Sequence, residues 1–185
     1  DENVVVSIST SGTGTEGTDY SNWESYLVSP EKALSGIEPG MSIFIGSGVA
    51  VPRTLLKQLI KSENSNLQDL ELIQLISFGD VISLEELEKR KYRLKTFSSG
   101  WHVDDAVGAG LVDLIPCRFA HIPGIIETEH IPIDAAFIQI TPPNKSGYCS
   151  LGIAVDVARQ AMEQATYVVG EINTKIPRTY GDTFV

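Results

Sequence analysis

Two glycines and a serine stand between an apolar segment and a leucine-rich segment, and their types suit an oxyanion site. Gly46, Ser47 and Gly48 follow the apolar run 43–45, and Pro52 precedes leucines that recur with helical spacing. Proline suits the first turn of a helix, because its missing N–H would have no partner there. We therefore expect a strand, a glycine turn and a helix. Such a turn directs backbone N–H groups toward one point, where they bind a carboxylate, a phosphate or a developing oxyanion.

The same pattern also occurs in ordinary strand-to-helix connections that bind nothing. Two nucleotide motifs are excluded. Val51 stands where G-x-G-x-x-G requires a third glycine, and no Gly-Lys-Ser/Thr is present for a phosphate-binding P-loop. The turn is therefore either a plain connection or a site for a small anion or acyl group.

The other residue types that commonly perform catalysis show no recognisable pattern. The three histidines have neither metal-ligand spacing nor a Cys or Glu motif beside them, so we expect no metal site. Ser47 lies outside any Gly-x-Ser-x-Gly elbow and is not marked as a hydrolase nucleophile. Cys117 and Cys149 have apolar neighbours, which favours buried reduced thiols over nucleophiles or a disulfide framework.

The composition is that of a soluble globular domain. The 185 residues are enough for one domain with a sizeable core, and 42% of them are apolar. With 14 Lys and Arg against 24 Asp and Glu, the net charge of −10 argues against nucleic-acid binding, which needs a positive surface. No apolar run approaches the roughly 18 residues of a membrane span, and no signal-peptide pattern is visible. We therefore expect a cytoplasmic protein without a membrane partner.

Hydrophobic periodicity predicts strands that alternate with helices. Residues 1–22 are rich in Ser, Thr and Gly and are expected to form a flexible tail, although three valines leave an edge strand open; the ordered domain is expected over 23–185. The expected strands are 43–45, 70–76, 92–97, 112–115, 135–140 and 167–172. The expected helices begin at Pro30 and at Pro52 and cover 84–91, 103–110 and 155–165. This alternation indicates an α/β fold, with an open, mainly parallel sheet and helices on both faces.

Three of the expected strands end in small residues, at 46–48, 77–79 and 98–100. Because the carboxyl ends of parallel strands share one edge, where ligands bind, these three ends favour a site there. The only basic cluster, Lys89–Lys95, could meet an anionic partner such as a phosphate. A solvated face or a charged guard on an edge strand is the favoured interpretation of the cluster.

Three motifs occur together and in order in the last third of the chain: Pro142-Pro143, Gly147-Tyr148-Cys149-Ser150-Leu151-Gly152 and Pro177-Arg178-Thr179-x-Gly181-Asp182. On these residues the sequence resembles the acetyl-CoA hydrolase/transferase family, which includes 4-hydroxybutyrate, butyrate and succinyl-CoA:acetate CoA-transferases. Upstream, Pro39-Gly40, the turn 46–52 and the strand end 97–99 also fit. The resemblance covers roughly 23–185 and implies a CoA-transferase-like domain.

The resemblance also implies that half of the enzyme is absent. Family members have two related α/β domains that face each other across the active site. The glutamate that becomes linked to the acyl group and to CoA belongs to the second half, so we expect no catalytic residue in this chain. Coenzyme A is then a substrate, and no permanently bound cofactor is expected. The implied partners are acyl-CoA, small carboxylic acids, the C-terminal domain and, in a homodimer, a second copy.

The resemblance gives the small residues of the turn a role beside the acyl group. Ser47, Gly48 and Val49 are expected to form one wall of the pocket, with backbone donors and little side-chain bulk. Weaker candidates for the same wall are Ser77, Phe78 and Ser99. The motif residues expected to support the site are Gly46, Pro52, Tyr148, Cys149, Ser150 and Gly152. The loop around Cys149 either contacts the substrate or packs beneath it.

Three alternatives remain open. The family includes hydrolases, in which water replaces the acceptor acid, and this half does not distinguish them from transferases. A related open α/β fold binds sugar phosphates, as the ribose-5-phosphate isomerases do, but Arg53 is the only cation near the turn. The chain could also act alone as a binding or assembly module.

Overall fold

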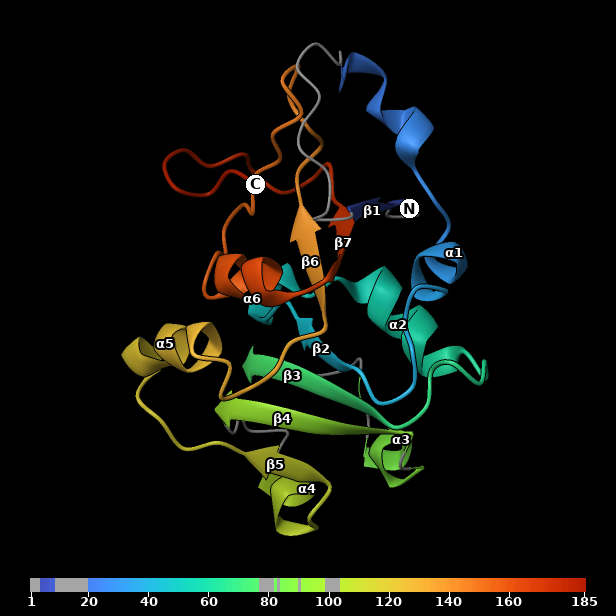
Figure 1. The fold of residues 1–185 in the computed structure, drawn as a ribbon, viewed down its shortest axis with the longest axis vertical. Coiled ribbons are helices and arrows are strands. Elements are labelled where there is room, and N and C mark those ends of the chain that lie inside the picture. Colours follow the sequence, from blue (N-terminus) through green and yellow to red (C-terminus); the bar gives the residue numbers. More distant parts are fainter. Residues whose placement is uncertain (1–3, 9–19, 77–81, 83, 90, 99–103) are drawn as a thin grey trace.

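The structure, a computed structural model, describes residues 4–8, 20–76, 82, 84–89, 91–98 and 104–185. It contains a seven-stranded sheet with the order β1-β7-β6-β2-β3-β4-β5 (Figure 1). The strands are β1 (Val4–Ile8), β2 (Ser42–Ile45), β3 (Leu70–Ile76), β4 (Tyr92–Ser98), β5 (Val112–Leu114), β6 (Ala135–Ile140) and β7 (Tyr167–Ile172). All of them except β1 run parallel to their neighbours. The predicted open, mainly parallel sheet is confirmed.

The edge strand β1 corrects one expectation. It pairs antiparallel with β7, and its β-branched residues suit a strand. It lies within the segment 1–22, where the valines left an edge strand open, and Val4–Ile8 form that strand rather than part of a tail. A 3₁₀ helix, η1 (Tyr20–Tyr26), begins before the expected domain boundary. The remainder of the expected tail, 1–3 and 9–19, lies outside the described residues.

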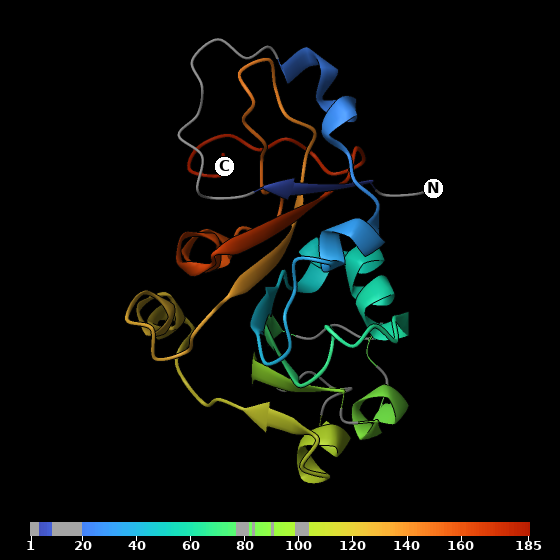
Figure 2. The same ribbon diagram turned by 45° about the vertical axis from the view of Figure 1, so that its right-hand side comes forward.

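Helices cover both faces of the sheet, as predicted (Figure 2). One face packs against α1 (Pro30–Leu34), α2 (Arg53–Lys61), α3 (Leu84–Glu88) and α4 (Asp104–Gly108). The other face packs against α5 (Ile122–Glu127) and α6 (Ala158–Gln164). Two further 3₁₀ turns are η2 (Gly48–Ala50) and η3 (Phe119–His121). Of these elements, α5, η2 and η3 are additions to the predicted set.

The two central strands, β2 and β6, are buried along their whole length. Ile43 and Ile45 of β2 join the core beneath α1 and α2, whereas Phe44 joins the core beneath α5 and α6. A slip of one residue would exchange these two sets of side chains between the faces. The burial of both faces therefore fixes the register of β2, and with it the position at which the strand ends.

Two helices begin close to where the prolines predict. Ser29 precedes α1, and its side chain accepts a hydrogen bond from the Lys32 N–H at 3.3 Å, as expected of an N-cap. Pro52 immediately precedes the first residue of α2, one position outside the expected start. The apolar face of α2 buries Leu55, Leu56 and Leu59.

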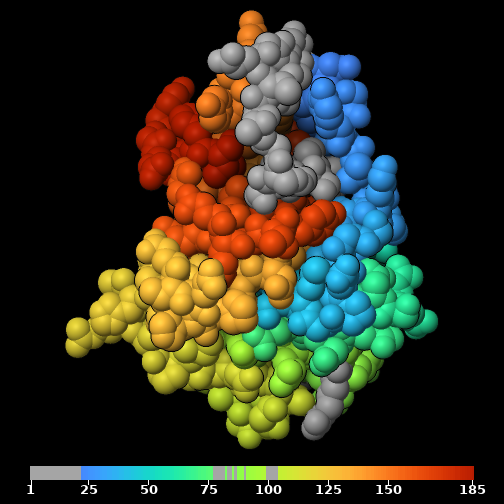
Figure 3. All heavy atoms as spheres, viewed as in Figure 1, coloured from blue at the N-terminus to red at the C-terminus, as the bar shows by residue number. Residues whose placement is uncertain are grey.

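The loop after β6 and the end of the chain are tied to each other, and Figure 3 shows these orange and dark red segments in contact at the surface. Ser150 and Phe184 form an isolated antiparallel bridge. Cys149 and Val185 exchange two backbone hydrogen bonds, of 2.9 and 3.0 Å. Arg178 donates to the carbonyl of Tyr148 at 3.2 Å. The motifs at 147–152 and 177–182 are therefore one structural unit.

Ser150 is the centre of this unit and is fully buried. Its hydroxyl oxygen accepts hydrogen bonds from the backbone N–H of Gly152 at 3.1 Å and of Thr179 at 3.2 Å. The hydroxyls of Thr179 and Thr183 lie 3.2 and 3.3 Å from it. One hydroxyl thus satisfies donors on both segments, which is the reason for a serine at this position.

We predict that Ser150→Ala lowers the free energy of unfolding by about 1–3 kcal/mol, because it leaves buried N–H groups without an acceptor. Urea unfolding followed by circular dichroism measures the change. Ser146→Ala, in the exposed part of the same loop, is the control and should change stability little. Equal stabilities for the two variants would contradict a central role for Ser150.

Candidate functional site

The chain order of the strands reverses between β2 and β6. These strands are neighbours, but β2 leads through α2 to β3 on one side, and β6 leads through α6 to β7 on the other. In open α/β sheets, ligands bind outside the carboxyl ends of the strands at such a reversal. The turn 46–52 follows β2 and the loop 141–152 follows β6, so both begin at this point.

The turn after β2 has a compact, specific geometry. The Gly46 N–H donates to the carbonyl of Phe137 on β6 at 2.9 Å, and the Ala50 N–H closes η2 on the Ser47 carbonyl at 3.0 Å. Gly48 has a φ of 58°, a conformation that favours glycine. A Cβ at Gly46 would lie 2.6 Å from the Ala50 carbonyl oxygen, so the backbone itself excludes a side chain there.

The Ser47 side chain faces the sheet. It is buried, and its oxygen accepts hydrogen bonds from the N–H groups of Leu75 at 2.9 Å and Ile76 at 3.4 Å. Ser47 therefore fastens the turn to the end of β3, and only its backbone is left for the wall role that the sequence predicts. Val49 differs, since 66% of its surface is exposed.

A row of buried polar side chains lies beneath the turn, on the face that carries α2. Gln74 of β3 donates to the Gly46 carbonyl at 3.4 Å, and Gln139 of β6 donates to the Val51 carbonyl at 3.2 Å. Glu171 of β7 is fully buried. These side chains hold both ends of the turn, and sequence analysis did not identify them. The available signal was a polar residue inside each of three largely apolar strands.

Glu171 occupies the start of α2. One of its carboxylate oxygens accepts hydrogen bonds from the N–H groups of Thr54 at 2.9 Å and Leu55 at 3.0 Å. The anion expected at this helix start is thus supplied by the chain itself, at least for these two donors. Among the described residues, the N–H groups of Gly48 and Val49 have no hydrogen-bond acceptor. The donors left for a ligand are therefore in η2, before the helix.

The candidates at the neighbouring strand ends are outside this geometry. Ser77, Phe78 and Ser99 are not among the described residues. They follow β3 and β4, which come next to β2 in the sheet order. Their assignment to the pocket wall stays a prediction. Pro52 is buried between η2 and α2 and so supports the turn.

The loop after β6 divides into a buried and an exposed part. Cys149 is buried, and burial raises the pKa of its thiol to about 11, although the charge of Arg178 opposes that shift. The thiol is therefore protonated at neutral pH and is no nucleophile. Gly152 has a φ of 71°, and Tyr148 is 56% exposed. Of the predicted motif residues in this loop, Tyr148 alone presents a large side chain to solvent.

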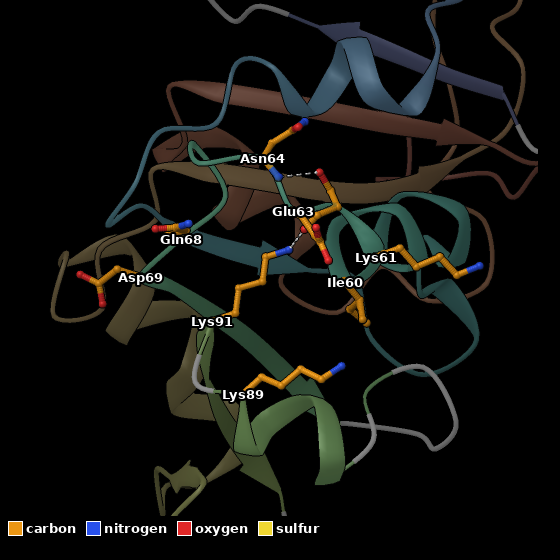
Figure 4. A pocket seen from close by; sticks show the side chains of 9 residues that line it. Ile60, Lys61, Glu63, Asn64, Gln68, Asp69, Lys89 and Lys91 are labelled. Atoms are coloured by element: carbon orange, nitrogen blue, oxygen red, sulfur yellow. Dashed lines mark hydrogen bonds between the residues drawn. The ribbon is translucent and has the colours of Figure 1, made fainter.

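A cavity lies at the opposite edge of the sheet. It has a volume of about 580 Å³ and is lined by Ile60, Lys61, Ser62, Glu63, Asn64, Gln68, Asp69, Lys89 and Lys91. Figure 4 shows Lys91 pointing toward the end of α2, where its Nζ donates to the carbonyls of Leu59 at 2.9 Å and of Ser62. Lys95 forms an ion pair of 2.8 Å with Glu71. These two members of the basic cluster thus bind groups of the chain itself.

The described part of the chain contains neither a membrane-spanning helix nor a metal-binding cluster. None of its helices is long and apolar enough to cross a membrane. No group of three or more His, Cys, Asp or Glu side chains within it could hold a metal ion.

The match to a known family spans the glycine turn and both tied motifs. Residues 14–185 match the model of the acetyl-CoA hydrolase/transferase N-terminal domain. The chain belongs to this family. It is 35% identical over 159 residues to 4-hydroxybutyrate coenzyme A transferase of Clostridium kluyveri, covering 86% of this chain and 37% of that protein.

A second curated relative and two solved structures agree with the family and the fold. The chain is 32% identical over 156 residues to a succinyl-CoA:acetate/propanoyl-CoA:succinate CoA transferase of Fasciola hepatica, covering 84% of this chain and 32% of that one. RipA from Yersinia pestis superposes with a TM-score of 0.75 at 22% identity, over 85% of this chain and 39% of RipA. A 4-hydroxybutyrate CoA-transferase from Porphyromonas gingivalis gives 0.61 at 22% identity, over 84% and 35%. The chain thus spans about a third of the length of these relatives.

We predict that Cys149 resists alkylation in the folded domain. With a pKa of about 11, roughly one thiol in a thousand is ionised at pH 8, and burial blocks the reagent as well. Iodoacetamide followed by peptide mass spectrometry measures the extent at each cysteine. Cys117, which is half-buried, should react first, and both should react in denaturant. Rapid labelling of native Cys149 at pH 8 would contradict the prediction.

The same shift makes stability depend on pH at the alkaline end. The pKa of the Cys149 thiol is 9.0 in the absence of burial and about 11 in the fold. Folding therefore favours the protonated thiol, and this contribution is complete below pH 9 and is lost as the pH rises toward 11. Thermal midpoints of wild type and Cys149→Ala should converge over this interval.

Proposed function

We propose that this chain is the N-terminal domain of an enzyme that transfers coenzyme A between an acyl-CoA and a small carboxylic acid. The observation that carries the proposal is the η2 turn, whose Gly48 and Val49 N–H groups lack acceptors among the described residues, at the strand reversal of a family domain. The names of the curated relatives support a transferase. The sheet edge then forms one wall of the acyl pocket, with Ser77, Phe78 and Ser99 as further candidates.

The proposed reaction uses a glutamate that lies outside this chain. Its carboxylate attacks the thioester carbonyl, the C–S bond breaks, and CoA thiolate leaves. The thiolate then attacks the glutamyl carbonyl, which releases the first acid and gives an enzyme thioester. An incoming carboxylate attacks the glutamyl thioester and displaces CoA thiolate, which gives a second mixed anhydride. The thiolate attacks the acyl carbonyl of that anhydride, so that the new acyl-CoA leaves and the glutamate carboxylate is regenerated. Each step forms a tetrahedral oxyanion, and the N–H groups of η2 stabilise one such centre.

The proposal assigns this domain binding and electrostatic roles. The described residues carry no activated nucleophile in the pocket wall: the Ser47 oxygen accepts two backbone donors, and the Cys149 thiol is protonated. A chain of these 185 residues should therefore not exchange CoA by itself. The expected cytoplasmic location and the homodimer belong to the same proposal.

The reaction is tested by incubating the complete enzyme with acetyl-CoA and butyrate and resolving the thioesters by chromatography. Butyryl-CoA should appear together with free acetate, without net release of CoA. Release of free CoA that does not require an acceptor acid would instead identify a hydrolase. Exchange at enzyme-like rates by the 185-residue chain would overturn the assignment of the nucleophile to another part of the protein.

The role of η2 is tested by Gly48→Asn, because asparagine tolerates the left-handed conformation that Gly48 adopts. We expect the thermal midpoint to change little and kcat to fall roughly tenfold to a hundredfold, since a side chain disturbs donors beside the acyl group. Gly48→Val is the strained comparison and should also lower stability, by about 1–2 kcal/mol. Near-normal turnover by Gly48→Asn would mean that the turn only connects β2 to α2 and does not serve the reaction.

A further inference from the structure

Glu171 has an unusual position for a carboxylate. It lies in β7, inside the sheet layer, with no exposed surface. Removing a carboxylate from water costs several kcal/mol unless hydrogen bonds or opposite charge compensate. Here the compensation includes the first N–H groups of α2, at 2.9 and 3.0 Å, and the partial positive charge of that helix end. The contact joins positions 117 residues apart in the sequence.

This contact is continuous with the turn that precedes α2. Gln139, the neighbour of Glu171 in the sheet register, donates to the Val51 carbonyl at 3.2 Å. The Asn173 amide donates to the Gln139 side-chain oxygen at 3.4 Å. Val51 lies between η2 and the helix, so the segment from η2 to the first turn of α2 rests on side chains of β6 and β7.

We propose that Glu171 is a positioning residue for the acyl-transfer site: its carboxylate fixes the start of α2 against β7 and thereby sets the direction of the Gly48 and Val49 N–H groups. The inference rests on the proposed function of η2 as a pocket wall. It adds a residue on a different strand, which does not touch the substrate and acts through the backbone of the turn.

A role in positioning explains why the helix cap comes from the sheet. Helix starts are ordinarily capped by the preceding Ser, Thr, Asp or Asn, which stabilises the helix at little cost. Pro52 occupies that position in α2 and has no side-chain donor or acceptor. A cap from β7 also fixes the helix relative to the sheet. Oxyanion donors act within about 2.7–3.1 Å, and a misplacement of about 1 Å costs roughly a hundredfold in rate.

The test is Glu171→Gln in the complete enzyme, compared with Tyr167→Phe. The glutamine keeps the shape and an acceptor oxygen but loses the charge at the helix start. Tyr167 lies on the same strand, and its hydroxyl donates to the Ala33 carbonyl of α1 at 2.7 Å rather than to a group of the turn or of α2. For Glu171→Gln we expect a fall in kcat of about tenfold or more, with KM for acyl-CoA within about threefold, as for an interaction made in the transition state. Tyr167→Phe should keep kcat despite a lower thermal midpoint.

Hydrogen exchange over 46–55, measured on the same proteins, follows the turn without reference to activity. Exchange there should accelerate in Glu171→Gln and stay at the wild-type rate in Tyr167→Phe. Gln139→Met removes the bond to Val51 and serves as a second variant should Glu171→Gln fail to fold. It should show the same fall in kcat and the same accelerated exchange over 46–55. Wild-type kcat per folded molecule in a variant with accelerated exchange would overturn the positioning role. Unchanged exchange over 46–55 in both Glu171→Gln and Gln139→Met would overturn it as well.

The outcome also separates this inference from the proposed function. If the wild-type enzyme exchanges no CoA between acids, the proposed function fails, while the exchange rates over 46–55 still decide whether Glu171 fixes the turn. If the enzyme is active and Gly48→Asn is impaired but Glu171→Gln is not, the pocket wall stands and the role of Glu171 falls.

Discussion

The handedness of the strand connections determines where this domain can bind a ligand. Parallel neighbours are joined by right-handed crossovers, so a chain that moves in opposite directions along the sheet must place its helices on opposite faces. Here α2 follows β2 on one face and α6 follows β6 on the other. Since β2 and β6 are adjacent, their following segments diverge from one point at the carboxyl edge. The chain leaves that point by a short glycine turn after β2 and by the longer loop 141–152 after β6.

The turn at this edge is held by polar contacts that bury several groups at once. Gln74, Gln139 and Glu171 lie in three different strands, and each binds a backbone group between Gly46 and Leu55. Buried polar side chains without partners would destabilise the sheet, and the turn supplies their partners. The buried side chains need the turn as their hydrogen-bond partner, and the turn needs these side chains to hold its backbone. These contacts restrain the conformation of the turn, as the proposed use of its backbone donors requires.

Local patterns were sufficient to predict the sheet and most of the helices. Apolar runs and helical spacing indicated six of the strands, and Ser29-Pro30 and Pro52 indicated two helix starts. The sequence leaves β1 open between an edge strand and a tail, because its pairing with β7 is a contact with the far end of the chain. The helix α5 was missed although Pro123 and the spacing of Ile122 and Ile126 were visible signals, because the segment is short. For Glu171 the only local signal was a charged residue in an apolar strand, and its role as a cap could not be predicted, since its partners lie 116 and 117 residues away.

The motifs that identify the family and the residues proposed to serve the reaction have different physical roles. The runs 147–152 and 177–182 carry the resemblance, yet groups of the two runs bind each other through the buried Ser150 hydroxyl and the partly exposed Arg178 guanidinium. Hydrogen bonding accounts for Ser150 and Thr179, and positive φ angles account for Gly147, Gly152 and Gly181, whatever the ligand. The η2 turn carries little sequence information, because backbone N–H groups are common to nearly all residue types. Such a turn is therefore identified by the glycine that permits its φ and by the distant side chains that hold it in place.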